Sequence, residues 1–151
     1  MSDNVIVATF NNSNSAYEAA SAIKALKDKG AVDFKLKTGV MVQKDDRGNV
    51  RLMEEKDRKP WGTGVGTLSG ALIGLIGGAP GAAIGAALGA TAGLTGDAVM
   101  GSLDSDFVDS VTKEMIPGMT ALIVEADEKS TRPVDEIVAL KGGHVHRQPA
   151  Q

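Results

Sequence analysis

Apolar and polar positions form regular patterns over two stretches of the chain, which an uncharged segment separates. In the first stretch, residues 4–10 (NVIVATF) are rich in β-branched side chains and predict a strand. Residues 15–29 place apolar side chains at helical spacing behind a polar cluster suited to an N-cap, so they predict an amphipathic helix. Residues 33–45 alternate again, and a turn at DRGN leads to a returning strand over 50–57, which completes a β-hairpin.

The second stretch has the same kind of pattern. Residues 104–116 carry one apolar helical stripe behind an Asp/Ser cap, and the dipeptide PG ends this predicted helix. Residues 119–127 predict a strand, and residues 130–143 predict a short helix with a proline in its first turn and a glycine stop. Residues 144–148 (HVHRQ) predict a last strand, so the order of this half is α-β-α-β.

Together the two stretches predict an α+β fold. Two βα units and a hairpin, with the helices on one face of an antiparallel sheet, are typical of a ferredoxin-like α/β sandwich. We therefore expect residues 1–57 and 103–151 to form one ferredoxin-like domain together. Residues 60–101 are then an insertion in that domain.

The inserted segment contains a stretch, residues 62–96, in which glycine recurs every fourth residue. This stretch carries no charge and holds twelve of the 19 glycines of the chain. The periodic glycines are Gly62, Gly66, Gly70, Gly74 and Gly78, then Gly81, Gly85, Gly89 and Gly93. Because residues at i and i+4 lie on nearly the same side of a helix, the spacing predicts two antiparallel helices that each carry a glycine groove, a glycine-zipper hairpin. The break at GGAPG is where the chain turns.

Glycine destabilises a helix interior by ~1 kcal/mol relative to alanine, so such helices need a closely packed partner backbone. Two environments supply one. In a lipid bilayer, Trp61 beside Arg58 and Lys59 would act as an interface anchor. In a homo-oligomer, the glycine and alanine content suits a helix buried between copies. Both alternatives stay open, and each predicts that the chain associates with itself.

The order of these elements resembles the bacterial domain-of-unknown-function family 1269. The resemblance rests on the short α/β half, the segment KPWGTGVGTLSGALIGLIGG, and the ALIV strand with the βαβ-like tail that follows it. It covers essentially the whole chain. It implies the same architecture and a bacterial or archaeal origin, and it implies no activity and no catalytic residues.

Composition narrows the function classes. The 151 residues carry a formal net charge of −3, which gives no basic face for nucleic acid. The chain has no cysteine, which excludes disulfides, thiolate catalysis and thiolate metal sites. The N-terminal residues have no basic region and no long apolar run, so we expect no signal peptide. We expect a cytoplasmic protein, with association with the inner membrane through residues 62–96 as the alternative.

One histidine pair is the candidate for site chemistry. His144 and His146 stand at i and i+2 of the predicted last strand, so both side chains should point to one face and could share a metal. Two ligands alone do not make a site, so we expect no metal and no cofactor. Asp104, Asp106 and Asp109 are typical of a helix cap and an acidic first turn rather than of a calcium loop.

These observations favour a non-enzymatic structural or interaction protein that self-assembles through the hairpin. The hairpin would either anchor the protein to a bilayer or form the interior of a homo-oligomeric assembly. The alternative is a small-ligand or metal-binding sensor of ferredoxin-like type, in which the histidine pair and a sheet face would carry the binding.

Overall fold

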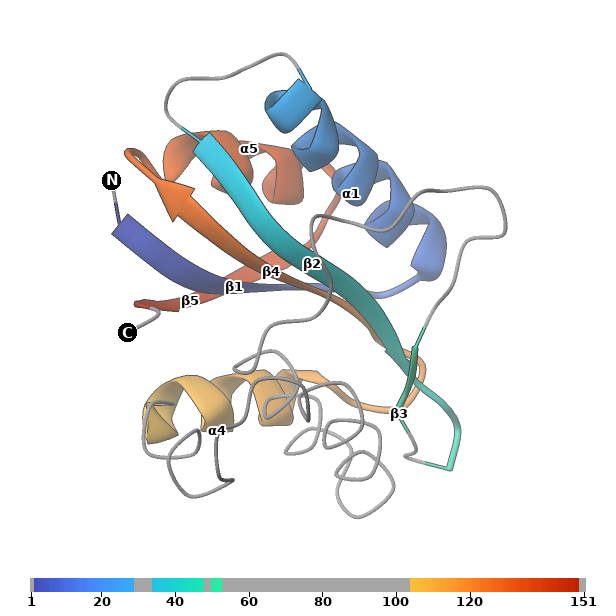
Figure 1. Ribbon diagram of the computed structural model, residues 1–151. Helices are drawn as coiled ribbons and strands as arrows, with labels where there is room; N and C mark the ends of the chain where they lie inside the picture. The colour runs from blue at the N-terminus through green and yellow to red at the C-terminus, as the bar shows by residue number, and fades with distance from the viewer. Residues whose placement is uncertain (1, 29–33, 48–49, 53–103, 150–151) are drawn as a thin grey trace.

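The computed structural model describes residues 2–28, 34–47, 50–52 and 104–149, which form a five-stranded sheet and three helices (Figure 1). The strands are β1 (Ser2–Phe10), β2 (Phe34–Lys44), β3 (Val50–Leu52), β4 (Thr120–Glu128) and β5 (His144–Pro149). The helices are α1 (Ser13–Asp28), α4 (Ser105–Glu114) and α5 (Arg132–Leu140). The predicted α+β class is therefore confirmed for these residues.

The strand order is β3-β2-β4-β1-β5, and every neighbouring pair is antiparallel. β1 and β4, which are neighbours inside the sheet, pair along their whole length, from Ser2 opposite Glu128 to Phe10 opposite Thr120. β5 forms one edge, where Thr9 of β1 lies opposite His144. The short β3 forms the other edge, and residues 53–57 of the predicted strand lie outside the described residues.

The helices lie on both faces of the sheet, which corrects the expectation that they share one face. α1 and α5 cover one face and α4 covers the other (Figure 1). The first face contributes the core residues Ile6, Ala8, Phe10, Leu122 and Val124, with Ile23 of α1 and Val134 and Val138 of α5. The second contributes Val5, Val7, Val42, Val50, Ala121 and Ile123, with Phe107 and Val111 of α4 and the adjoining Met115.

Burial on both faces explains the uninterrupted apolar runs in the strands. A strand with one face in water alternates apolar and polar side chains, whereas a strand covered on both faces needs apolar residues at successive positions. β1 carries such a run at residues 5–8 and β4 at residues 121–124, and all eight residues are buried. In β2, a register shift between Leu36 and Thr38 marks a bulge.

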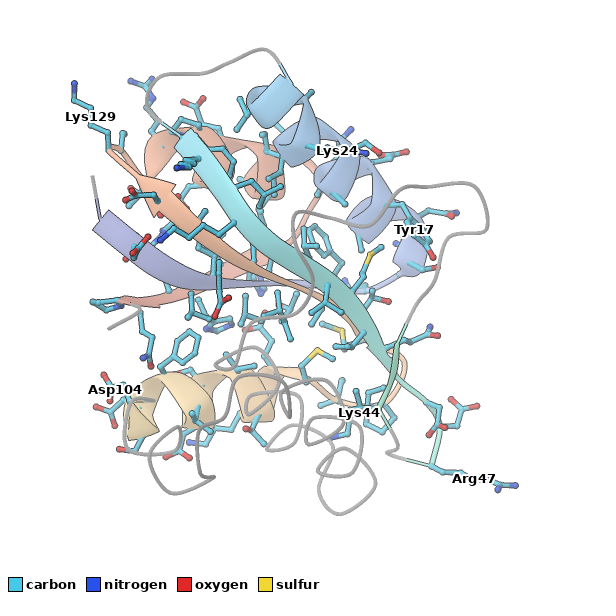
Figure 2. All side chains as sticks on the ribbon, viewed as in Figure 1. Tyr17, Lys24, Lys44, Arg47, Asp104 and Lys129 are labelled. Atoms are coloured by element: carbon cyan, nitrogen blue, oxygen red, sulfur yellow. The ribbon has the colours of Figure 1, made fainter. Side chains whose placement is uncertain are left out.

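Local capping signals set the helix ends where the sequence predicts them. The Asp104 side chain accepts a hydrogen bond from the backbone N–H of Asp106 at the start of α4 (Figure 2). After α5, Gly142 has φ +75° and donates its backbone N–H to Ala139, and Gly143 donates to the carbonyl of Val138. This is the glycine stop of a helix C-terminus.

A tight turn links α4 to β4. Pro117 and Gly118 occupy its two central positions, Gly118 has φ +92°, and the N–H of Met119 donates to the carbonyl of Ile116 at 3.1 Å. Proline followed by a glycine of positive φ is the sequence signature of a type II turn.

Among the helices that the structure describes, none has the length and apolar character that a membrane span requires.

Candidate functional site

A polar cluster joins the end of α4 to the edge of the sheet. His144 and His146 lie on the same face of β5, as their spacing predicted, and both contact the carboxylate of Glu114, the last residue of α4. His144 Nδ1 lies 2.6 Å from Glu114 Oε1, and His146 Nε2 lies 2.9 Å from Glu114 Oε2. The His144 side chain is largely exposed, whereas those of His146 and Glu114 are 16% and 24% exposed.

Thr9 of β1 supplies the third contact of this cluster. Its hydroxyl donates a hydrogen bond to Glu114 Oε1, the oxygen that His144 also contacts. An ionised carboxylate can only accept hydrogen bonds, so the geometry assigns an N–H to Nδ1 of His144 and to Nε2 of His146. One carboxylate thus ties together β1, α4 and β5.

The ionisation of Glu114 responds to two opposed effects. Burial raises the pKa of this carboxyl, but the hydrogen bonds from Thr9, His144 and His146 outweigh burial, so the pKa lies below its usual value. The cluster therefore holds Glu114 as a carboxylate at neutral pH. Thr9 and Glu114 carry no local sequence signal for this role, because their contact spans 105 residues.

The two imidazoles of the metal hypothesis both contact Glu114. Across the described ranges there is no group of three or more His, Cys, Asp or Glu side chains that could hold a metal ion. The ring nitrogens of His144 and His146 that face the cluster are occupied by the Glu114 oxygens. Through these nitrogens the pair donates hydrogen bonds to Glu114.

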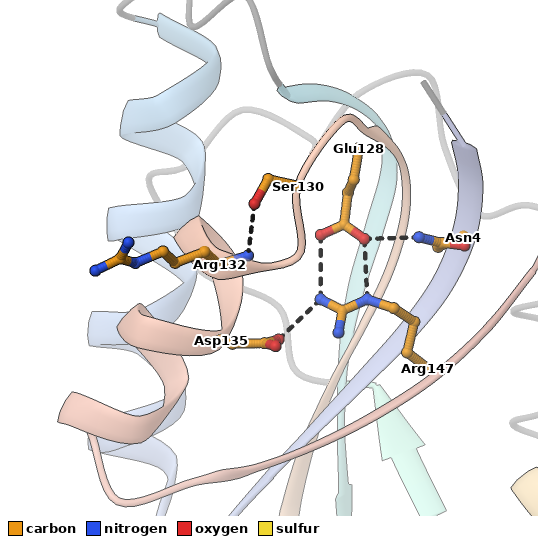
Figure 3. A network of polar contacts seen from close by, with 6 residues as sticks. All are labelled: Asn4, Glu128, Ser130, Arg132, Asp135 and Arg147. Carbon is orange, nitrogen blue, oxygen red and sulfur yellow. Dashed lines mark hydrogen bonds and ion pairs between the residues drawn. The ribbon is translucent and has the colours of Figure 1, made fainter.

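A second polar network lies on the opposite face of β5 (Figure 3). Arg147 donates from Nε to Glu128 Oε2 at 2.9 Å and from Nη2 to Glu128 Oε1 at 3.1 Å, a bidentate pair. Arg147 Nη2 also donates to Asp135 Oδ1 of α5 at 2.9 Å, and Asn4 Nδ2 of β1 donates to Glu128 Oε2 at 2.8 Å. The network therefore connects β1, β4, β5 and α5.

The burial and the pairing of its charged groups indicate that this network stabilises the fold. The Glu128 side chain is 1% exposed and the Arg147 side chain 17%. Burial lowers the pKa of Arg147, but the hydrogen bonds to Asp135 and Glu128 outweigh it and raise the pKa above its usual value. Each oxygen of Glu128 and both donating nitrogens of Arg147 have partners, so this network fastens α5 and β5 to the sheet. Neither Glu128 nor Arg147 was predicted from the sequence.

The predicted glycine-zipper residues and the predicted interface anchor Trp61 lie outside the described residues. The site that the structure does describe therefore shares only His144 and His146 with the sequence prediction.

Comparison with known families bears on the second half of the chain. A family model described as "Protein of unknown function (DUF1269)" matches residues 63–149, more than half of the 151 residues. The match includes the glycine-rich stretch from residue 63 onward and every element from α4 to β5, and it leaves the first 62 residues outside. Neither a curated protein nor a solved structure matches this chain.

Proposed function

The chain belongs to the DUF1269 family, and within it we propose that this protein is a non-enzymatic structural protein that self-assembles through a glycine-zipper hairpin at residues 62–96. The observation that carries the proposal is the four-residue period of glycine in a stretch of 35 residues without a charge. The α+β domain would act as the folded carrier of this hairpin.

The strand order supports a ferredoxin-like carrier domain. If β3 is set aside, the remaining order is β2-β4-β1-β5 with antiparallel neighbours, which is the arrangement of a βαββαβ sandwich. α1 and α5 follow β1 and β4 and cover the same face, as the two crossover helices of that sandwich do. In this proposal α4 is an addition on the opposite face.

The elements on either side of the glycine segment support an insertion that leaves and returns on one side of the sheet. Val50 of β3, the last described strand before the segment, lies in the same apolar cluster as Phe107 and Val111 of α4, the first described helix after it. A helical hairpin brings its two ends back together, so it suits such an attachment.

The energetics of glycine explain why self-association is expected. Four or five interior glycines weaken each helix by roughly 4–5 kcal/mol relative to alanine. Close approach of two backbones offsets this loss through dispersion and Cα–H···O contacts, which larger side chains prevent. Pairing the two grooves within one hairpin leaves the alanine faces free for other copies. The assembly would lie either inside a homo-oligomer or in a bilayer, with Trp61 at the interface.

The described polar groups support a non-enzymatic role. The carboxylates of Glu114 and Glu128 accept hydrogen bonds from neighbouring elements, and Arg147 donates to Glu128 and Asp135. Each group therefore holds one element of the fold against another.

The decisive experiment is light scattering coupled to size exclusion, first without detergent and then in mild detergent. We expect a mass several times 15.5 kDa in at least one condition. Gly70→Leu and Gly85→Leu should each reduce this mass and leave the circular dichroism of the α+β domain unchanged. Ser69→Leu is the matched control, because it adds the same side chain beside Gly70 but outside the glycine period. A monomer under both conditions, or glycine variants of unchanged mass, would refute the proposal.

A further inference from the structure

α4 is held on the sheet at both ends by alternate residues of one strand. At its beginning, the backbone N–H of Asp104 donates to Gln148 Oε1 of β5 at 2.7 Å. At its end, Glu114 accepts from His144 and His146 of the same strand. Between these ends, Phe107 and Val111 pack against the sheet, so the polar attachment of α4 depends on few groups.

The end formed by Glu114 differs chemically from the end formed by Asp104. The contact between Asp104 and Gln148 joins a backbone N–H to a neutral amide, which does not change with pH. The Glu114 carboxylate accepts three hydrogen bonds, two on Oε1 and one on Oε2. When a carboxylate takes a proton, one oxygen becomes a donor, so the donors aimed at it lose an acceptor.

We propose that Glu114, Thr9, His144 and His146 form a proton-operated latch that holds the end of α4 on β1 and β5 while Glu114 is ionised and releases it when Glu114 is protonated. The latch acts within the α+β domain and does not depend on the proposed self-assembly. It is a regulatory contact on α4, the first described helix after the glycine segment along the chain.

The surroundings of Glu114 indicate that protonation of Glu114 itself, rather than of a neighbouring histidine, releases the end of α4. The groups that act on its ionisation are Thr9 from β1 and His144 and His146 from β5. The other elements under α4, β2 and β4, contribute apolar residues such as Val42 and Ile123. The acidic Glu125 of β4 shares this face opposite Val5, level with Gln148 at the beginning of α4 rather than with Glu114 at its end. A further proton on either imidazole would bind the ring nitrogen that faces away from Glu114, so it would leave both contacts in place.

The direction of the pH effect follows from the lowered pKa of Glu114. A carboxyl whose pKa is lower in the folded state than in the unfolded state stabilises the fold above the unfolded pKa, and this contribution is lost as the pH falls through the folded pKa. The latch is therefore closed at neutral pH and opens in acid. Removing the donors removes the effects that lower the pKa and leaves burial, which raises it, so release should then occur at higher pH.

The test is an NMR pH titration of the full chain from pH 7 to pH 3. The backbone amides of α4, such as that of Val111, are followed together with those of the central strands and with the side-chain carboxyl of Glu114. We expect the α4 signals to change with the same midpoint as the Glu114 carboxyl, while the signals of β1 and β4 keep their native positions. Glu114→Gln should give the released α4 signals already at pH 7. Glu136→Gln is the matched control, because Glu136 is a largely exposed helical glutamate that pairs with Arg132 of its own helix.

A second pair of variants separates hydrogen bonding from histidine titration. In His144→Asn with His146→Gln, an amide N–H can replace each imidazole donor, so the release pH should stay near that of the wild type. In His144→Ala with His146→Ala, both donors are gone, and the release pH should rise above that of the wild type. Native α4 signals in Glu114→Gln from pH 7 to pH 3 would overturn the latch. If Glu114→Gln does not fold, an unchanged release pH in the double alanine variant overturns it instead.

Discussion

Removal of the Arg147 side chain should be among the most damaging single changes in the α+β domain. Arg147→Met keeps much of the aliphatic volume but withdraws both hydrogen bonds from Glu128, whose side chain is 1% exposed. The loss of one partner from a buried ion pair leaves an uncompensated charge and costs about 3–5 kcal/mol. For a chain of this size, about 2–4 °C per kcal/mol converts this cost into a fall in Tm of roughly 6–20 °C.

The assay is thermal and urea unfolding followed by far-ultraviolet circular dichroism, with all variants at one concentration because association shifts apparent stability. Arg132→Met is the matched control: it removes an arginine from an exposed ion pair, with side chains 82% and 59% exposed, and should leave Tm unchanged. Adding Glu128→Gln to Arg147→Met removes the stranded charge and keeps an acceptor for Asn4, so it should restore part of the lost stability. If Arg147→Met unfolds like the wild type, or if the second change restores nothing, the buried-charge argument is wrong.

Two further predictions concern backbone space and the insertion. A Cβ on Gly143 would lie 2.5 Å from Phe10 Cε1 and 2.9 Å from the Thr9 carbonyl oxygen, so Gly143→Ala should destabilise the domain by about 1–3 kcal/mol in urea unfolding. Gly142→Ala meets no atom within 4 Å, so its cost of about 1–2 kcal/mol should come from the positive φ of +75° alone; a Gly143→Ala variant as stable as the wild type would contradict the contact argument. Deleting residues 60–100 and joining the ends with a short Gly/Ser linker should leave a domain that unfolds cooperatively. Loss of cooperative unfolding would show that the segment belongs to the core.

In the candidate site, local spacing along the chain predicted the shared face of the two histidines but not their partner. The i, i+2 spacing predicted that His144 and His146 share a face, because side chains alternate along a strand. It could not predict their partner, since Glu114 lies 30 and 32 residues away along the chain and Thr9 lies still farther. The metal hypothesis for the pair arose from the two imidazoles alone, and the structure adds Glu114 as a partner of both.

The local signals of the sequence determined most helix and strand positions. Three of these signals act over only a few residues, so each can be identified without knowledge of the fold. They are the Asp104 cap, the glycine stop after α5 and the Pro117–Gly118 turn. The alternation in residues 33–45 likewise predicted β2, which runs from Phe34 to Lys44.

The tertiary structure alone decided the side of the sheet on which each helix lies. The apolar runs at residues 5–8 and 121–124 indicate that both faces of these strands are buried. The runs do not indicate which helix covers which face. That choice depends on contacts between distant segments, such as Val5 and Val7 with Phe107 of α4. The same placement brings Glu114 to His144 and His146, because it sets the end of α4 beside β5. Long-range packing therefore created the polar cluster from residues whose own neighbours along the chain do not point to it.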